Sequence, residues 1–493
     1  MGTKATLLLL LAVLCYGLAS TAAHHHHHGE EEEGGGGGGG DWRGEGEEME
    51  DRHHRGEKAF LLRDWKRVVH TDAGEMRVLR SFRSQRSAER STRIGFINME
   101  PSTLFIPQYT DSGLVLFVRK GEARLGTIYR NEPVERSLRK GDVYRIPAGS
   151  AFYLVNTGES RKLRVICSIE IDTSEEDLPT RNFQSFFLGG GPNPASILTG
   201  FDPETLATAF NVSSGEVQEI LSREIEGPIV HMSDSRRPSA WSKFMELDEQ
   251  DRLRHLRKAV REYGDEDEDE DEDEQIEWSW RKLLESVLGR RRRPESRDEW
   301  GHRHAPDSCN LYDRSPDFRN DYGWSVALDE YDYKPLRHSG IGIYLVNLSP
   351  GSMMAPHVNP TATEYGIVLS GSGTIQIGYP NGSSAMNARV REGDVFWIPR
   401  YFPFCQISSN SGSLEFFGFT TSARRNRPQF LAGRNSVLRA MGGPELARSF
   451  GVSDKRLAEL LRAQRESVIL PSPEAAAGGP DQGFDGGDLV ADF

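Results

Sequence analysis

The strongest constraint on the fold is an internal repeat. Residues 141–147 read GDVYRIP, and residues 393–399, 252 positions later, read GDVFWIP. A second set of matches has an offset of 240 and joins Leu206, Phe210, Val212, Ser213 and Leu221 to Leu446, Phe450, Val452, Ser453 and Leu461. Self-similarity in the same order along the chain indicates a duplication. The sequence therefore predicts two similar globular blocks in tandem, at residues 58–225 and 308–470.

Each block has the pattern of a β-rich domain. In the first block, short runs of Val, Ile, Leu, Phe and Tyr alternate with Gly, Pro and Asp. These runs lie at residues 94–99, 114–119, 123–129, 142–146, 152–156 and 163–169. Many short strands at close spacing indicate an antiparallel sandwich or barrel. Two helices are predicted after the strands, because Asp202-Pro203 is a helix start and Ser213 or Ser214 can cap a second helix that ends near Arg223.

The segments outside these blocks do not have the composition of a packed domain. Residues 1–23 have the pattern of a cleavable signal peptide, with a membrane anchor as the alternative. Residues 24–57 are rich in His, Glu and Gly, residues 226–307 contain the runs DEDEDEDEDE and RRRR, and residues 471–493 form a tail. Such stretches bury too little apolar surface to offset their ordering entropy. We expect disordered ends and a solvated linker, with a short amphipathic helix as the alternative within the linker.

Charge and cysteine content narrow the function classes. The formal net charge of -14 disfavours binding to nucleic acid. No later segment reaches the about 18 apolar residues of a membrane span, so we expect no membrane contact after signal removal. Cys15 would leave with the signal peptide, and Cys167, Cys309 and Cys405 would remain. Three cysteines cannot all pair within one chain, so stability must rest on apolar cores rather than on a disulfide framework.

The repeated GDVxxIP stretch resembles the second motif of the cupin family, G-x5-P-x-G-x2-H-x3-N. The first block matches it at Gly141, Pro147, Gly149 and Asn156, with Phe152 in the place of the histidine. The second block matches only the first glycine and the proline, and the remaining places hold Tyr401, Phe404 and Ser408. The resemblance implies two tandem jelly-roll β-barrels, each followed by a short α-helical extension, in a mostly β protein.

The first cupin motif, G-x5-H-x-H-x3,4-E-x6-G, is kept better in the second block. Gly351, His357, Asn359, Glu364 and Gly371 fall on it in register. In the first block, counting back from the glycine at position 121, its three ligand places hold a proline at 107, a tyrosine at 109 and a leucine at 114. Cupin enzymes hold Mn or Fe with three histidines and one glutamate. The resemblance therefore implies no ligand in the first barrel and two in the second.

A residual metal site is one hypothesis for the second barrel. His357, Glu364 and Cys405 are its candidate ligands, and imidazole with thiolate suits copper. An ideal strand would point Cys405 away from the barrel interior, so a β-bulge would be needed to redirect it. The alternative is a packed histidine beside a structural free thiol, with no cofactor.

The whole pattern is similar to the vicilins, the 7S seed globulins. The stretches that carry this similarity lie at residues 98–109, 341–348, 354–365 and 396–401. It implies a non-enzymatic nutrient reservoir that assembles as a homotrimer through its helical tails, in the protein storage vacuole or outside the cell. The alternatives are a module that binds a small ligand in the C-terminal barrel, such as a sugar or organic acid, and a metal-dependent cupin enzyme. Whether Phe152, Tyr401 and Phe404 fill the barrels or leave a pocket separates these readings.

Three sequons are candidate N-glycosylation sites in a secretory chain. They begin at Asn211, Asn347 and Asn381. Asn381 belongs to an Asn-Gly hairpin turn and should be exposed, whereas Asn347 lies in an apolar strand. We therefore expect Asn381 to be the most accessible acceptor and Asn347 the least.

Overall fold

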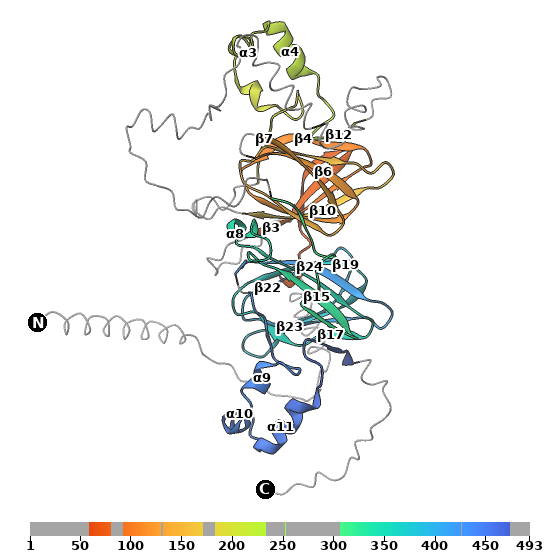
Figure 1. Cartoon of the computed structure of the whole chain (residues 1–493), viewed down its shortest axis with the longest axis vertical. Helices are drawn as coiled ribbons and strands as arrows, with labels where there is room; N and C mark the ends of the chain where they lie inside the picture. Colours follow the sequence, from red (N-terminus) through yellow and green to blue (C-terminus); the bar gives the residue numbers. More distant parts are fainter. Residues whose placement is uncertain are drawn as a thin grey trace, which may run out of the picture. The chain divides into compact units, whose positions relative to one another are not determined.

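The computed structural model contains two β-barrels that follow each other along the chain (Figure 1). Residues 1–58, almost all of 226–307 and residues 474–493 lie outside the described part of the chain. The signal peptide, the segment rich in His, Glu and Gly, and the disordered tail therefore stay predictions. The residues that the structure describes are 59–79, 92–129, 132–170, 183–232, 252, 306–424 and 426–473.

The first barrel consists of two antiparallel sheets. Its strands are β1 (Trp65–Thr71), β2 (Gly74–Leu79), β3 (Thr92–Met99), β4 (Thr103–Thr110), β5 (Leu114–Lys120), β6 (Glu122–Tyr129), β7 (Glu132–Arg139), β8 (Asp142–Ile146), β9 (Phe152–Asn156), β10 (Leu163–Glu170), β11 (Ser185–Phe187), β12 (Ile229–His231) and β13 (Cys309–Asn310). One sheet has the order β1-β2-β3-β10-β5-β8-β13. The other has the order β11-β4-β9-β6-β7, with β12 paired to β4.

The second barrel repeats this plan. Its strands are β14 (Phe318–Asn320), β15 (Gly323–Leu328), β16 (Gly342–Leu348), β17 (Ser352–Met354), β18 (His357–Val358), β19 (Glu364–Ser370), β20 (Ser372–Gly378), β21 (Ser384–Arg391), β22 (Val395–Ile398), β23 (Pro403–Ser408), β24 (Leu414–Thr420), β25 (Gln429–Phe430) and β26 (Ile469–Pro471). The sheets have the orders β14-β15-β16-β24-β19-β22 and β21-β20-β23-β17-β26, and β18 pairs with β23 and β25. The prediction of two tandem jelly-roll barrels is confirmed.

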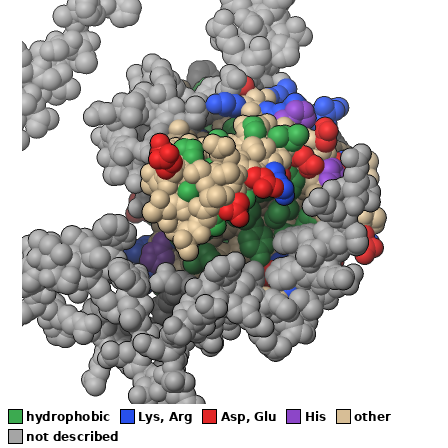
Figure 2. All heavy atoms as spheres, turned by 90° about the horizontal axis from the view of Figure 1, so that it is seen from above, with side chains coloured by type: hydrophobic (Ala, Val, Ile, Leu, Met, Phe, Trp, Pro, Cys, Tyr) green, Lys and Arg blue, Asp and Glu red, His purple; other side chains and the backbone are tan. Residues whose placement is uncertain are grey.

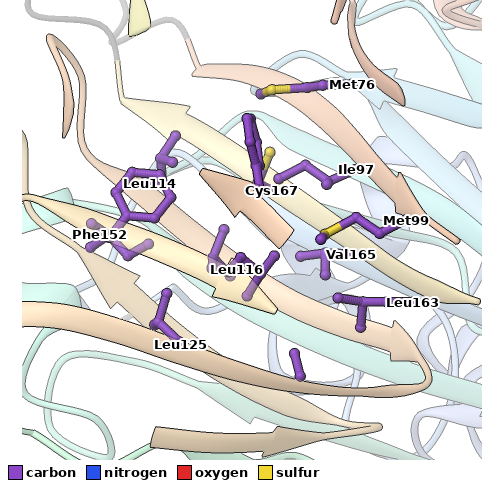
Figure 3. Packing of buried hydrophobic residues seen from close by; sticks show 14 of the residues in the cluster. Met76, Ile97, Met99, Leu114, Leu116, Leu125, Phe152, Leu163, Val165 and Cys167 are labelled. Atoms are coloured by element: carbon purple, nitrogen blue, oxygen red, sulfur yellow. The ribbon is translucent and has the colours of Figure 1, made fainter. Parts of the chain in front are cut away.

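The apolar pattern of each strand follows from the layers that it separates. In β20, Ile375 and Ile377 point into the second barrel, whereas Gln376 between them is exposed. Strand β5 is apolar from Leu114 to Val118 because both of its faces are covered there. Its inner residues lie in the core of the first barrel, part of which is shown in Figure 3, and its outer residue Phe117 stacks on Phe417 of the second barrel with ring centroids 3.9 Å apart.

A helical extension follows each barrel, as predicted. The helices of the first are η1 (Ile197–Gly200), α3 (Pro203–Phe210) and α4 (Ser214–Ser222), and those of the second are α9 (Val437–Ala440), α10 (Pro444–Ser449) and α11 (Asp454–Ala463). The short α8 (Leu336–Ser339) belongs to the second barrel. The Asp202 side chain caps α3, and Ser213 caps α4 in a full capping box with Glu216. No helix among the described residues is long and apolar enough to cross a membrane.

The two barrels exchange short arms. The first arm, residues 59–62, precedes β1 but lies on the second barrel, where the Leu62 amide donates to the Val395 carbonyl at 2.8 Å and Phe60 packs among aromatic rings. The second arm, residues 309–312, precedes β14 but extends the sheet of the first barrel beyond β8. There the Leu311 amide donates to the Gly141 carbonyl at 3.0 Å. Each barrel is therefore completed by residues from the other half of the chain.

Candidate functional site

His357 lies inside the second barrel on β18. Its strand pairs with β23 and β25, so the imidazole packs against Phe404 and Phe430, with ring centroids 4.0 and 5.3 Å away. Its Nδ1 lies 2.8 Å from the Ala355 carbonyl oxygen, which can only accept, so Nδ1 carries the proton and Nε2 keeps its lone pair. Burial lowers the pKa of His357 to about 4, against the effect of this hydrogen bond. The ring is therefore neutral at physiological pH.

Glu364 is a buried carboxyl group at the start of β19. Its Oε1 accepts a hydrogen bond of 2.7 Å from Asn359 Nδ2, and its carboxyl group also bonds to the Tyr344 side chain. Burial raises the pKa of Glu364 to about 7, although both hydrogen bonds favour the charged form. The carboxyl group is therefore largely protonated in an acidic compartment and increasingly ionised above neutral pH.

Asn359 positions Glu364 rather than acting as a metal ligand. Its Nδ2 donates both to Glu364 and to Asn426 Oδ1, the latter at 2.8 Å. Its Oδ1 accepts from the backbone amides of Thr361 and Ala362 and from the Thr361 hydroxyl, at 3.0 to 3.1 Å. The side chain is thus used by the turn between β18 and β19, which leaves its oxygen with no capacity for a metal ion.

Cys405 does not lie beside His357. Strand β23 runs in regular register against β20, with Phe404 opposite Ile377 and Cys405 opposite Gln376, so no bulge redirects the thiol. Phe404 faces the core, and Cys405 therefore faces the other side of the sheet, where its Sγ lies 3.9 Å from Gln376 Oε1. Burial raises the pKa of Cys405 to about 11. This geometry gives the copper hypothesis no support.

The remaining donor set does not fit the metal of a cupin enzyme. His357 and Glu364 match two of the four ligand places of the motif, but in the other two places Asn359 is committed to its turn and Phe404 has no lone pair. Among the described residues, no three His, Cys, Asp or Glu side chains converge in a metal-binding group.

The first barrel has Gln108 in the place of His357. Gln108 pairs with Phe152 as His357 pairs with Phe404, and both phenylalanines lie in the same place of the repeat. Counting along the sequence predicts Pro107 for this place, which is wrong by one residue because β4 shifts register before Gln108. The connection from this residue to the next strand is also one residue shorter than in the second barrel. Gln108 is fully buried, and the irregular spacing of the two motifs is the signal that could have found it.

The place of the glutamate is apolar in the first barrel, as predicted. Leu114 begins β5 and pairs with Ile146, whereas Glu364 begins β19 and pairs with Ile398 in the matching position. Figure 3 shows Leu114 and Phe152 among the other side chains of this core. The first barrel therefore has apolar side chains in the places of the glutamate and of the last histidine, and the uncharged Gln108 in the place of His357.

Two of the three aromatic side chains in question fill the barrels. Phe152 and Phe404 are buried in the first and second core, respectively. Tyr401 instead is 58% exposed, and its backbone amide donates to the Asn359 carbonyl at 3.0 Å. It has a φ of 66°, where the first barrel has Gly149 with a φ of 71°. A tyrosine thus takes a backbone conformation that favours glycine.

The three sequons lie in different environments. Asn381 is exposed between β20 and β21, and its Oδ1 accepts from the Ser383 amide and hydroxyl at 3.1 and 2.8 Å. Asn211 is exposed at the carboxyl end of α3, where it adopts a left-handed conformation. Asn347 is half-buried in β16, between β15 and β24.

A protein-family model described as "Cupin" matches residues 66–218 and 309–457, which cover most of both barrels and parts of their helical extensions. Among curated proteins, a vicilin-like seed storage protein of Arabidopsis thaliana is 50% identical over 423 residues. This match covers 85% of the chain and 81% of the relative.

Solved structures of vicilins have the same fold. Vicilin from Corylus avellana aligns with a TM-score of 0.65 at 22% identity, over 84% of this chain and 99% of that one. Vicilin from Solanum melongena aligns with a TM-score of 0.65 at 20% identity, over 84% and 97% of the chains, and contains different anionic ligands in structurally similar pockets.

Proposed function

The chain belongs to the cupin family as a two-cupin protein of the vicilin type, and on this basis we propose that it is a non-enzymatic seed storage globulin that serves as a nutrient reservoir. The observation that carries the proposal is the half-identical relative, a vicilin-like seed storage protein, which the match covers over most of its length. The two buried phenylalanines in the places of the third metal histidine support the absence of catalysis.

A storage role is consistent with two packed barrels that are joined and flanked by polar segments. Two densely packed barrels keep the chain compact and resistant to proteases, while the segments outside them offer sites for cleavage. We place the protein in the secretory pathway, with the protein storage vacuole or the extracellular space as its destination, because residues 1–23 have the pattern of a signal peptide.

The expression pattern tests this role. Protein abundance, followed by quantitative mass spectrometry, should rise late in seed development and fall steeply at germination. A low and constant level in leaves and seeds would contradict storage. Elemental analysis of the purified protein tests the absence of catalysis, because stoichiometric Mn or Fe would support the alternative of a metal-dependent cupin enzyme.

We propose that the chain assembles as a homotrimer through its helical extensions. Both extensions expose apolar side chains at the same places of the repeat: Phe201, Phe210, Val212 and Ile220 in the first, and Met441, Phe450, Val452 and Leu460 in the second. Figure 2 views the end that carries α3 and α4 and shows hydrophobic side chains among charged ones at this surface. In α11, Leu457 is buried whereas Leu460 is exposed. A head-to-tail contact between the two extensions forms a closed ring if the rotation between copies closes.

Light scattering of native protein tests the trimer. We expect the mass of three chains for the wild type and of one chain for the double variant Ile220→Glu/Leu460→Glu, because two buried charges oppose the contact. Tyr331→Glu is the matched control, since Tyr331 is equally exposed but lies outside both extensions. A monomeric wild type, or a variant that keeps the trimer mass, would disprove this mode of assembly.

A second candidate function is binding of a small ligand in the second barrel. Gln406 pairs with the core residue Ile375, and its buried Oε1 has no hydrogen-bond partner. This oxygen and the Nε2 lone pair of His357 are both acceptors, so they suit the hydroxyl groups of a sugar or another polyol rather than an ionised acid. Thermal unfolding with a panel of such compounds tests this function. A rise in Tm of several degrees that Gln406→Leu abolishes would support it, and no rise at millimolar ligand would exclude it.

A further inference from the structure

Glu135 is a buried carboxylate on the outer face of the first barrel. It lies on β7, where Leu138 points into the core, so residues 135, 137 and 139 point outward. Ser137 and Arg139 are exposed as this position requires, but Glu135 is only 2% exposed. Something on the outside of the sheet must therefore cover Glu135 locally.

The covering group is Arg252. It belongs to the segment between β12 and β13, residues 232–308, which we call the insert. Its Nε lies 2.9 Å from Glu135 Oε2, and the two side chains are 5% and 3% exposed. The Tyr153 hydroxyl donates to Glu135 Oε1 at 2.7 Å, and Arg124 Nε lies 3.9 Å from Glu135 Oε2. A buried ion pair of this kind persists only when further hydrogen bonds compensate the lost hydration, and Tyr153 supplies one.

The outer face is shaped for this contact. Gly126 lies opposite Glu135 on β6, and a Cβ atom there would meet the Tyr153 ring at 2.0 Å. The glycine therefore leaves room for the ring that holds the carboxylate. Burial and the nearby Glu135 carboxylate raise the pKa of Tyr153, so its hydroxyl keeps the proton that it donates.

The covered area extends beyond the ion pair. Val155 is fully buried on β9 and pairs with Arg124, on the face opposite to Phe152 and Leu154, which lie in the core. Within the described part of the chain, Val155 belongs to none of the apolar clusters. Val155 is therefore a second side chain on the outer face of this sheet that has no solvent contact.

Both ends of the insert begin at the same sheet. The last strand before it, β12, pairs with β4. Where the chain returns, the Pro306 carbonyl accepts from Arg136 Nε at 3.4 Å, and Asp307 forms an ion pair with the same guanidinium at 3.1 Å. Arg136 follows Glu135 on β7, the edge strand of the sheet, and its side chain starts from the opposite face of that strand. The insert thus leaves from one strand of this sheet and returns to another.

We propose that the outer face of β9, β6 and β7 is a docking surface for the insert of this same chain, and that Arg252 anchors it by its ion pair with Glu135, whose carboxylate also contacts Tyr153 and Arg124. The occupant is the chain segment that carries Arg252. The docking does not depend on the storage function.

Hydrogen exchange of the full chain, followed by mass spectrometry, tests the docking. In Glu135→Ala, peptides that contain Arg252 should exchange roughly tenfold faster or more, because removal of one partner leaves a buried charge. The exchange of barrel strands such as β5 and β10 should not change. Asp313→Ala is the matched control, since it removes the exposed partner of Arg139 on the same strand and should leave the insert unaffected.

The charge-exchanged double variant Glu135→Arg/Arg252→Glu should restore slow exchange in part. If Glu135→Ala disturbs the barrel itself, Arg252→Gln decides, because that residue lies outside the barrel. Unchanged exchange of the insert in both single variants would overturn the proposal. A faster exchange confined to the peptides around Arg252 would support it, and cleavage of the insert by glutamyl endopeptidase should accelerate in parallel.

Discussion

At the scale of single residues, the second barrel holds two buried groups whose pKa values shift in opposite directions. The folded pKa of His357 is about 4, below its ordinary value of 6.5, so its contribution to stability is lost as pH falls from about 6.5 to 4. The folded pKa of Glu364 is about 7, above its ordinary value of 4.5, so its contribution is lost as pH rises from about 4.5 to 7. Between pH 4.5 and 6.5 the two effects offset each other.

Single variants should reveal each effect. Relative to wild type, Glu364→Gln should gain stability as pH rises from about 4.5 to 7, and His357→Gln should gain as pH falls from about 6.5 to 4. Each difference should approach about 3 kcal/mol at its limit. Urea unfolding across this pH range measures it, and groups that titrate in all variants cancel in the difference. Parallel curves for wild type and both variants would mean that neither group titrates as its burial requires.

Asn381 should be the most fully glycosylated of the three sequons. It is exposed in a turn, whereas the backbone of Asn347 is held between two neighbouring strands. Expression in a eukaryotic secretory host, followed by peptide mass spectrometry with and without glycosidase, measures the occupancy. Asn381→Gln should remove most of the glycan mass. Full occupancy at Asn347 would show that this residue is glycosylated before β16 pairs with β15 and β24.

At the scale of elements, local signals were sufficient where an element depends on its own residues. The helix start at Asp202 and the cap at Ser213 follow from side chains within three positions of the amides that they satisfy. Strands such as β8 and β9 have the bounds that their apolar runs predict. The place of Gln108 was missed because a register shift inside β4 depends on its partner β9, which counting within one segment does not detect.

The two matched helix caps should differ in strength. Ser213 accepts from the Glu216 amide while Glu216 bonds back to the Ser213 amide, but Ser453 has Arg456 in the third position and no such return bond. Ser213→Ala should therefore destabilise α4 by about 1 kcal/mol or more, and Ser453→Ala should destabilise α11 by less. Local hydrogen exchange of the two helices measures both. Equal losses would mean that the return bond adds nothing.

At the scale of the whole molecule, long-range contacts join the halves and could not be predicted from the sequence. The arms pair with strands that lie far away along the chain, as Leu61 with Phe396 and Cys309 with Val143. Arg252 reaches Glu135 from an insert whose composition predicts a solvated linker. Such contacts depend on three-dimensional proximity that no local pattern records. The duplication indicated two barrels. It did not indicate that each barrel is completed by an arm from the other half of the chain.

This exchange predicts that the covalent link through the insert is dispensable once the chain has folded. The halves share an apolar core that includes the stacked Phe117 and Phe417, and each contributes an arm to the other's sheet. We expect these contacts to keep the two chains associated without a peptide bond. A protease site placed within residues 270–290 and cut after folding should leave one particle in native size-exclusion chromatography. The same sample should give two fragments under denaturing conditions.

The arms should determine how stably the two fragments of the cut protein stay associated. Leu311→Ala removes a fully buried side chain of the second arm, so in the cut protein it should lower the urea concentration at which the fragments separate. Asp313→Ala changes an exposed side chain two residues away and should leave that concentration unchanged. Because the uncut chain keeps its halves at a high effective concentration, Leu311→Ala should affect it less. Separation of the wild-type fragments without denaturant would show that the link, rather than the exchanged arms, holds the barrels together.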